Sequence, residues 1–177
     1  VAADQTTPER VNTGVVESDD KPILGGSVAY ALAGESNGWN PLTNQWGPPG
    51  WMVARTIFDQ LASFDEESNV HPFFATKFEH NEDFTVWTVH VRTGVKFSNG
   101  KPANAEAIAK EQRLLATSPV VGGSYALVKR TGAGVPMIDA VGEDKVVYTM
   151  TQTYTTFPSL LAAQVGTVAD PDWVASN

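Results

Sequence analysis

The segment from Phe84 to Ile108 constrains the fold of this chain more than any other part. It begins with alternating side chains, the pattern of an extended strand that presents two faces. The two faces are formed by Phe84, Val86 and Thr88 on one side and by Trp87, Val89 and Val91 on the other. The pattern predicts a strand that is followed at once by turn-forming residues.

The second half of this segment predicts a tight turn and a capped helix. Asn99 and Gly100 form a strong turn signal because both residue types tolerate positive φ. Asn104 is expected to cap a helix over residues 105–116, with Glu106 near its positive end. A strand, a turn and a helix therefore follow one another within 25 residues.

The remaining elements alternate between extended and helical segments. A helix is expected to begin at Pro48 and to run to about Phe64, because Val53, Ile57 and Leu61 form one apolar stripe. Extended segments are expected at 25–32, 70–74, 137–141, 145–151 and 165–171. The Gly-rich stretch 117–136 is expected to be an irregular loop.

Composition excludes several classes of function. The net charge is −8 and the isoelectric point is near 4.7, so a nucleic-acid partner is not expected. The chain has no cysteine, which excludes disulfides and thiolate metal sites. No apolar run approaches the roughly 20 residues of a membrane helix, and residues 1–20 lack the apolar region of a signal peptide.

The order of elements around Phe84 resembles the signature region of the family 5 extracellular solute-binding proteins. These proteins are the peptide, dipeptide and nickel-type receptors of ATP-driven importers. The matching residues are Trp87, Thr88, Val91, Arg92, Gly94, Val95, Phe97, Gly100, Pro102, Ala105 and Glu106. Asn99 replaces the usual Asp, Asn104 replaces the usual Thr or Ser, and Ala107 replaces a second Asp. Each replacement keeps turn or helix chemistry.

The resemblance implies a mixed α/β fold like that of the periplasmic binding proteins of type II, cluster C. It covers residues 24–171, so the chain is expected to be an incomplete N-terminal lobe with mixed or antiparallel sheets and few helices. Residues 1–23 would be a flexible leader. Residues 24–48 together with 146–177 would belong to the sheet of lobe I, and residues 49–145 would form a smaller subdomain.

The same resemblance implies a function in transport. The chain would be the N-terminal part of an exported receptor that captures a small solute, with a peptide favoured, when two lobes close over it. Its partners would be that solute, a membrane permease and the C-terminal lobe of the same protein. We expect no enzymatic activity and no cofactor. The protein would reside in the periplasm or on the outer face of the membrane. Whether a lipid anchor precedes Val1 is left open.

Two arguments select candidate binding residues. The resemblance places the segment after the first strand in the cleft between the lobes, which maps onto Gly34, Glu35, Ser36 and Asn37. Independently, Trp39, Trp46 and Trp51 fall within 13 residues, with Asn40 among them. Aromatic faces beside amide groups suit a small ligand. Trp39, Asn40 and Trp46 are therefore included in the ligand-binding set, although all three tryptophans could instead be structural.

Other chemistry receives weaker support. His71, His80 and His90 have no metal-ligand spacing, so no metal site is expected. Two alternatives to a receptor stay open at this point. One is a free-standing carbohydrate-binding module that uses Trp39, Trp46 and Trp51. The other is a small hydrolase that uses Glu79, Glu82 and Asp83.

Overall fold

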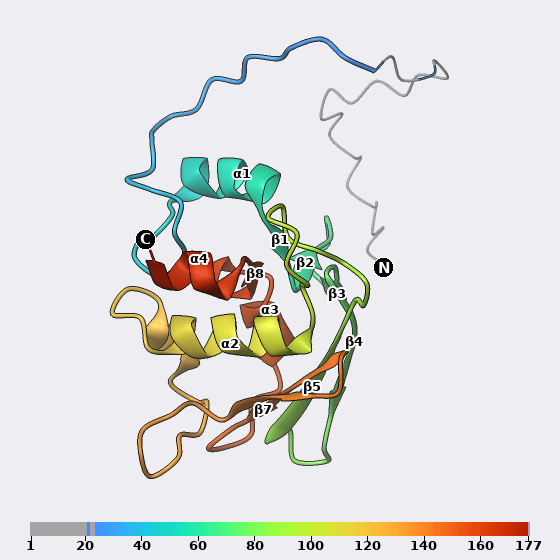
Figure 1. Ribbon diagram of the computed structural model, residues 1–177, viewed down its shortest axis with the longest axis vertical. Coiled ribbons are helices and arrows are strands. Elements are labelled where there is room, and N and C mark those ends of the chain that lie inside the picture. Colours follow the sequence, from blue (N-terminus) through green and yellow to red (C-terminus); the bar gives the residue numbers. More distant parts are fainter. Residues whose placement is uncertain (1–20, 22–23, 177) are drawn as a thin grey trace, which may run out of the picture. The chain divides into compact units, whose positions relative to one another are not determined.

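A computed structural model describes Lys21 and residues 24–176 of the chain. The chain divides into two units, Val1–Ala31 and Leu32–Asn177. Every helix and strand of the described residues lies in the second unit (Figure 1). The leader predicted for residues 1–23 lies, apart from Lys21, outside the described residues.

The strand predicted at residues 25–32 is not formed. This segment has no regular secondary structure, and its apolar side chains are exposed, with Val28 at 91% and Tyr30 at 71%. No described strand pairs with it. Alternating side chains do not make a strand unless a neighbour accepts its backbone hydrogen bonds, which is why the local pattern misled here.

A four-stranded antiparallel sheet is the largest element of the second unit. Its strand order is β4-β5-β7-β6. The strands are β4 (Ala75–His80), β5 (Val86–Val91), β6 (Ile138–Val141) and β7 (Lys145–Thr149). β6 and β7 form the predicted hairpin, in which Gly142 adopts a φ of 68° at the turn. The predicted two faces of β5 are confirmed, because Trp87, Val89 and Val91 are all buried.

Helix α2 (Ala105–Ala116) covers one face of this sheet, and its bounds are those predicted (Figure 1). Asn104 caps it as expected, since its Oδ1 accepts a hydrogen bond of 3.1 Å from the backbone N–H of Ala107. Ile108 and Leu115 are fully buried between the helix and the sheet. Helix α3 (Phe157–Leu160) contributes Phe157 to the same core.

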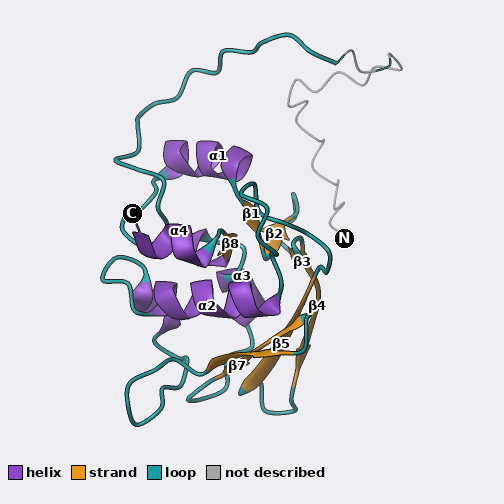
Figure 2. Ribbon diagram, viewed as in Figure 1, coloured by secondary structure: helices purple, strands orange, loops and turns teal. Residues whose placement is uncertain are grey.

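Short elements surround this core on the side of the helices (Figure 2). They comprise α1 (Pro48–Ile57), β1 (Asp59–Gln60), β2 (Ala62–Phe64), β3 (Val70–Pro72), the 3-10 turns η1 (Gly122–Tyr125) and η2 (Gln164–Gly166), β8 (Thr167–Val168) and α4 (Pro171–Ser176). β1 pairs with β8, and β2 pairs with β3, both antiparallel. The predicted irregular stretch 117–136 contains η1, whose Tyr125 is buried.

Two predicted boundaries are wrong. Helix α1 ends at Ile57 and not near Phe64, because the next residues find distant backbone partners. The N–H of Leu61 donates to the carbonyl of Gly166, at 2.7 Å. The strand predicted at 165–171 is reduced to β8, since a 3-10 turn precedes it and α4 follows. A Cβ at Gly166 would lie 1.7 Å from the carbonyl oxygen of Leu161, so only glycine fits this crossing.

Candidate functional site

Four of the seven predicted binding residues surround one small pocket, which we call the loop pocket. Gly34, Glu35, Ser36 and Trp39 line it from the segment that precedes α1. The first turns of α1 close its other side with Pro49, Gly50 and Val53. Its volume is about 220 Å³, enough for one side chain or a short stretch of a ligand.

Local hydrogen bonds give the wall of the loop pocket its shape. The Ser36 hydroxyl donates to the carbonyl of Gly38, at 2.8 Å, and the Trp46 indole N–H donates to the same oxygen, at 3.1 Å. Gly50 lets α1 pack closely against Trp46, since a Cβ at position 50 would lie 3.2 Å from Cβ of Trp46. Glu35 is exposed, and its carboxylate makes no hydrogen bond or ion pair within the described residues. Asn37 is exposed beside the pocket but does not line it.

Asn40 and Trp46 lie in the interior. Asn40 is 5% exposed, and its side-chain amide donates to the carbonyl of Val174, at 2.8 Å. Trp46 is 4% exposed, and its backbone N–H donates to Oε1 of Gln164, at 3.1 Å. These contacts tie the loop to the C-terminal elements. A direct role of these two residues with a ligand stays a prediction, while the contacts observed for both are structural.

An aromatic cluster is centred on Trp46. Its ring stacks on Phe58 with centroids 5.9 Å apart and planes 13° apart, and it meets Trp51 edge-on at 5.8 Å. Trp39 lies 6.4 Å away with a tilt of 45°. The three tryptophans are therefore neighbours, but their planes differ and the central one is buried. They do not form a single exposed platform for a sugar.

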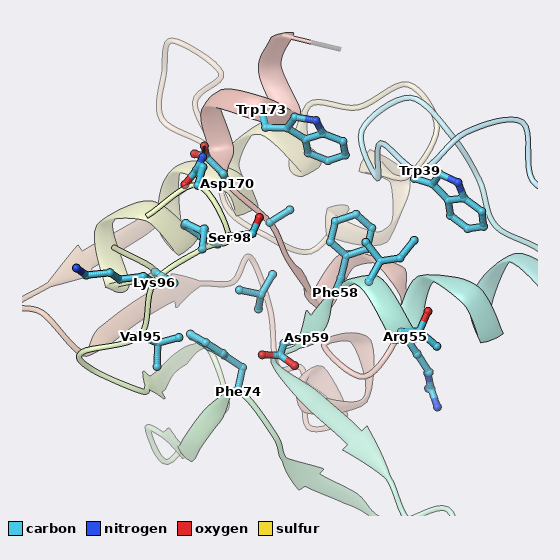
Figure 3. A pocket seen from close by; sticks show the side chains of 17 residues that line it. Trp39, Arg55, Phe58, Asp59, Phe74, Val95, Lys96, Ser98, Asp170 and Trp173 are labelled. Atoms are coloured by element: carbon cyan, nitrogen blue, oxygen red, sulfur yellow. Dashed lines mark hydrogen bonds between the residues drawn. The ribbon is translucent and has the colours of Figure 1, made fainter. Parts of the chain in front are cut away.

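A larger cleft, here called the Phe58 cleft, has a volume of about 610 Å³ (Figure 3). It is formed by the end of α1 with β1, by the loop at residues 95–99, and by β8 with the start of α4. Sequence reasoning missed its main side chains, Phe58, Asp59 and Trp173. Phe58 lies in the sequence next to the apolar stripe of Val53, Ile57 and Leu61, a position that does not mark it as a cleft residue. No local signal marks Asp59 or Trp173, because the pairing of β1 with β8 brings their segments together.

A polar network closes one end of the Phe58 cleft. Asn99 donates to Oδ2 of Asp170, at 2.5 Å, and Lys101 donates to the same oxygen, at 3.0 Å. Burial raises the pKa of Asp170, but these hydrogen bonds and the backbone N–H of Asp172 outweigh it, so that the pKa is lowered. Lys101 also forms an ion pair with Asp172, and Lys110 forms a second ion pair with Asp172. The hydrogen bonds from Lys101 and Lys110 lower the pKa of Asp172 to about 2.

The histidines occupy hydrogen-bonded positions on the surface of the strands. His71 lies 2.7 Å from Asp65, and His90 lies 2.8 Å from Glu79. Hydrogen bonds from Lys77 and His90 lower the pKa of Glu79 to about 2, so this carboxylate is ionised and poorly suited to act as a general acid. Within the described residues, no three His, Cys, Asp or Glu side chains are grouped so as to hold a metal ion.

Comparison with known proteins identifies the family. Residues 69–177 match the family described as bacterial extracellular solute-binding proteins, family 5 middle. The chain belongs to this family. Family 5 proteins are named for binding a solute and not for a reaction, which agrees with the expectation that the chain is not an enzyme.

Two curated relatives show what family 5 contains. The periplasmic oligopeptide-binding protein OppA of Salmonella typhimurium is 32% identical over 128 residues, which is 71% of this chain and 22% of the relative. The nickel-binding periplasmic protein of Escherichia coli is 36% identical over 74 residues, 41% of this chain and 14% of the relative. The chain thus spans about a fifth or less of the length of these relatives.

Solved structures confirm the fold class. OppA of Haemophilus influenzae, in complex with the peptide RPPGFSPFR, superposes with a TM-score of 0.67 at 24% identity, covering 77% of this chain and 29% of that one. The murein tripeptide binding protein MppA of Escherichia coli gives 0.68 at 21% identity, with 82% and 31% covered. The fold is that of part of a periplasmic binding protein, mixed α/β with antiparallel sheets and few helices.

The helices of the described residues are all shorter or more polar than a membrane-spanning helix requires.

Proposed function

We propose that this chain is the N-terminal part of an exported receptor that captures a small solute, in the first place an oligopeptide, for an ATP-driven importer. The observation that carries the proposal is the family 5 match over residues 69–177. The oligopeptide-binding relative aligns with more of the chain than the nickel-binding one, 71% against 41%, which favours a peptide. The names of both relatives place them in the periplasm, which supports export.

The loop pocket would form part of one wall of the binding cleft. Gly34 and Ser36 offer backbone groups, Glu35 and Asn37 offer exposed polar side chains, and the half-buried ring of Trp39 offers an aromatic face. Asn40 and Trp46 would hold this wall in place from behind. A second lobe would close over the solute, and the solute would stabilise the closed state by binding it more tightly than the open one.

The domain division belongs to the same proposal. Residues 24–48 and 146–177 would contribute to the sheet of lobe I, and residues 49–145 would form the smaller subdomain. β1 pairs with β8 and β5 pairs with β7, so backbone hydrogen bonds join residues 49–145 to residues 146–177 across this proposed division. A permease of the importer would recognise the closed receptor, whether the receptor is free or lipid-anchored.

Calorimetric titration with tri- to pentapeptides tests the proposal at two levels. The 177-residue chain should give no saturable binding at concentrations that saturate the longer receptor. In the longer receptor, Trp39→Ala should weaken peptide affinity by about tenfold or more, because an aromatic face in a binding cleft is a frequent hot spot.

Glu82→Gln, in the turn between β4 and β5, is the matched control and should leave the affinity unchanged. Full-strength peptide binding by the 177-residue chain would refute the division of the site between two lobes. If the longer receptor does not bind these peptides, the proposed ligand class is refuted.

A further inference from the structure

The Phe58 cleft has the properties of a second binding site. Its volume of about 610 Å³ lies within the range of small-molecule sites, roughly 300–1,000 Å³. Trp39 is the one lining residue that it shares with the loop pocket, and its other walls come from the end of α1 with β1, from the loop at 95–99 and from β8 with α4. The site therefore does not depend on the proposed peptide cleft.

Aromatic faces line one side of this cleft. The rings of Phe58 and Trp173 have centroids 5.9 Å apart and planes tilted by 41°, so they form an open corner. Figure 3 shows both rings beside the cavity, with Trp39 farther along the same wall. The stacked ring of Trp46 supports Phe58 from behind. An aromatic corner that is backed in this way is rigid and presents ring faces to a ligand.

The charge that faces the cavity is negative. Asp59 directs its carboxylate into the cleft in Figure 3, and within the described residues this group has no hydrogen bond or ion pair. The two cationic side chains among the labelled residues, Arg55 and Lys96, extend outward from the cavity in the same view. Asp170 is already bound by Asn99 and Lys101. Asp59 is thus the carboxylate still available to a ligand.

We propose that the Phe58 cleft binds an organic cation: an ammonium group attached to an aromatic or apolar body. The ammonium would pair with Asp59 and lie near the ring faces of Phe58 and Trp173, which attract cations. The body would occupy the apolar floor that Phe74, Val95 and Val168 provide. Neither an anion nor a neutral aromatic compound would satisfy both the carboxylate and the aromatic corner.

The test uses benzylammonium as the probe, with benzyl alcohol and benzoate as ligands of the same body but different charge. Titration of the 177-residue chain is followed by NMR through the indole N–H signals of Trp39 and Trp173. Benzylammonium should give saturable shifts of both signals. Benzyl alcohol should bind at least about fivefold more weakly, because it lacks the ion pair and the cation–π contact.

Two variants locate the site. Asp59→Asn should weaken benzylammonium binding about fivefold and leave benzyl alcohol unchanged, since only the charge is removed. Asp83→Asn, an exposed acid in the turn after β4, removes the same charge elsewhere and should change neither. Far-UV circular dichroism checks that each variant is folded.

The proposal fails if benzylammonium gives no saturable shift, if benzyl alcohol binds equally well, or if Asp59→Asn binds benzylammonium as the unmodified chain does. If the longer receptor does not bind peptides but benzylammonium still binds, the proposed transport of peptides fails and the proposal for the Phe58 cleft stands.

Discussion

Asn99 joins a turn of the chain to the start of α4. Its side-chain N–H donates to Oδ2 of Asp170, a contact across 71 positions of sequence. The family 5 pattern usually has Asp at this turn, and an Asp here would place a second carboxylate against Asp170. The amide therefore suits the contact with Asp170 as well as the turn itself.

Asn99→Asp is predicted to lower the free energy of unfolding at pH 7 by about 1 kcal/mol more than Asn99→Ala, because it adds repulsion to the loss of a hydrogen bond. Urea denaturation of both variants measures the difference. The difference should shrink toward pH 3, where one of the two carboxyl groups binds a proton. A difference that does not depend on pH would contradict this electrostatic account.

Glu111 is a carboxyl group in the core of the second unit. It is fully buried, its Oε1 accepts a hydrogen bond of 3.0 Å from the backbone N–H of Ala169, and its Oε2 has no hydrogen-bond partner among the residues that the structure describes. Burial raises the pKa of Glu111 well above its ordinary value of 4.5, which the hydrogen bond from Ala169 only partly offsets. The group is therefore protonated in the folded chain at pH values where it is ionised in the unfolded chain.

Glu111→Gln is predicted to stabilise the protein at pH 8 relative to the unmodified chain. The unfolded chain releases the Glu111 proton near pH 4.5, and the folded chain releases it only at higher pH. The stability contribution of this group is thus complete below pH 4.5 and declines as pH rises toward the folded-state pKa. Urea denaturation between pH 4 and pH 9 should show that decline, and Glu111→Gln should remove it.

The control is Glu106→Gln, in the exposed first turn of α2, which should leave the slope intact. If Glu111→Gln keeps the pH dependence of the unmodified chain, Glu111 is not its source.

At the scale of elements, α2 is held in place by Gln112 as well as by its apolar face. The Gln112 amide donates to the carbonyl of Val165, at 2.8 Å. Its Oε1 accepts from the hydroxyl groups of Tyr125 and Tyr148, at 2.9 and 3.1 Å. One side chain thus connects α2 with η1, β7 and η2.

Gln112→Leu is predicted to lower the free energy of unfolding by roughly 2–4 kcal/mol, because it removes three buried hydrogen bonds and leaves the Tyr148 hydroxyl without its partner. The Tyr125 hydroxyl keeps its bond to the carbonyl of Val165, at 3.0 Å. Tyr148→Phe is the milder comparison and should cost about 1 kcal/mol, since Gln112 keeps its contact with Tyr125. Thermal or urea unfolding followed by circular dichroism gives both values. Equal costs for the two variants would argue against a central role of Gln112.

Sequence patterns predicted some elements well and others poorly. The strand β5, the hairpin of β6 and β7, and the helix α2 follow from alternation, a turn glycine and a cap, which are all local signals. The end of α1 and the short β8 do not, because both depend on backbone partners more than 100 residues away. In the candidate site, Gly34, Glu35, Ser36 and Trp39 could be grouped from the sequence because they belong to one continuous segment. The Phe58 cleft could not, because it forms only when β1 pairs with β8.

At the scale of the molecule, one apolar core unites the sheet, α2 and α3. Phe157 is fully buried at its centre, with ring centroids 5.8 Å from Trp87, 4.8 Å from Tyr148 and 5.9 Å from Tyr154. These aromatic contacts connect α3 to two adjacent strands of the sheet. The stability of the second unit should therefore respond to this single side chain.

Phe157→Ala is predicted to lower the free energy of unfolding by about 3–5 kcal/mol, through lost burial and the cavity that remains. Val141→Ala, on an exposed position of β6, should change it by less than about 0.5 kcal/mol. Tryptophan fluorescence and far-UV circular dichroism should report the same transition in both variants if the second unit unfolds cooperatively. Separate transitions would show that the core is divided.

Residues that are neighbours along the chain were enough to predict the family, the strand–turn–helix from Phe84 to Ile108 and the capped start of α2. Three features became evident only in the folded chain: Trp46 and Asn40 are buried, α1 ends at Ile57, and Phe58 and Trp173 share a cleft. The physical reason is that such burial depends on distant partners, as when Asn40 donates to the carbonyl of a residue 134 positions away.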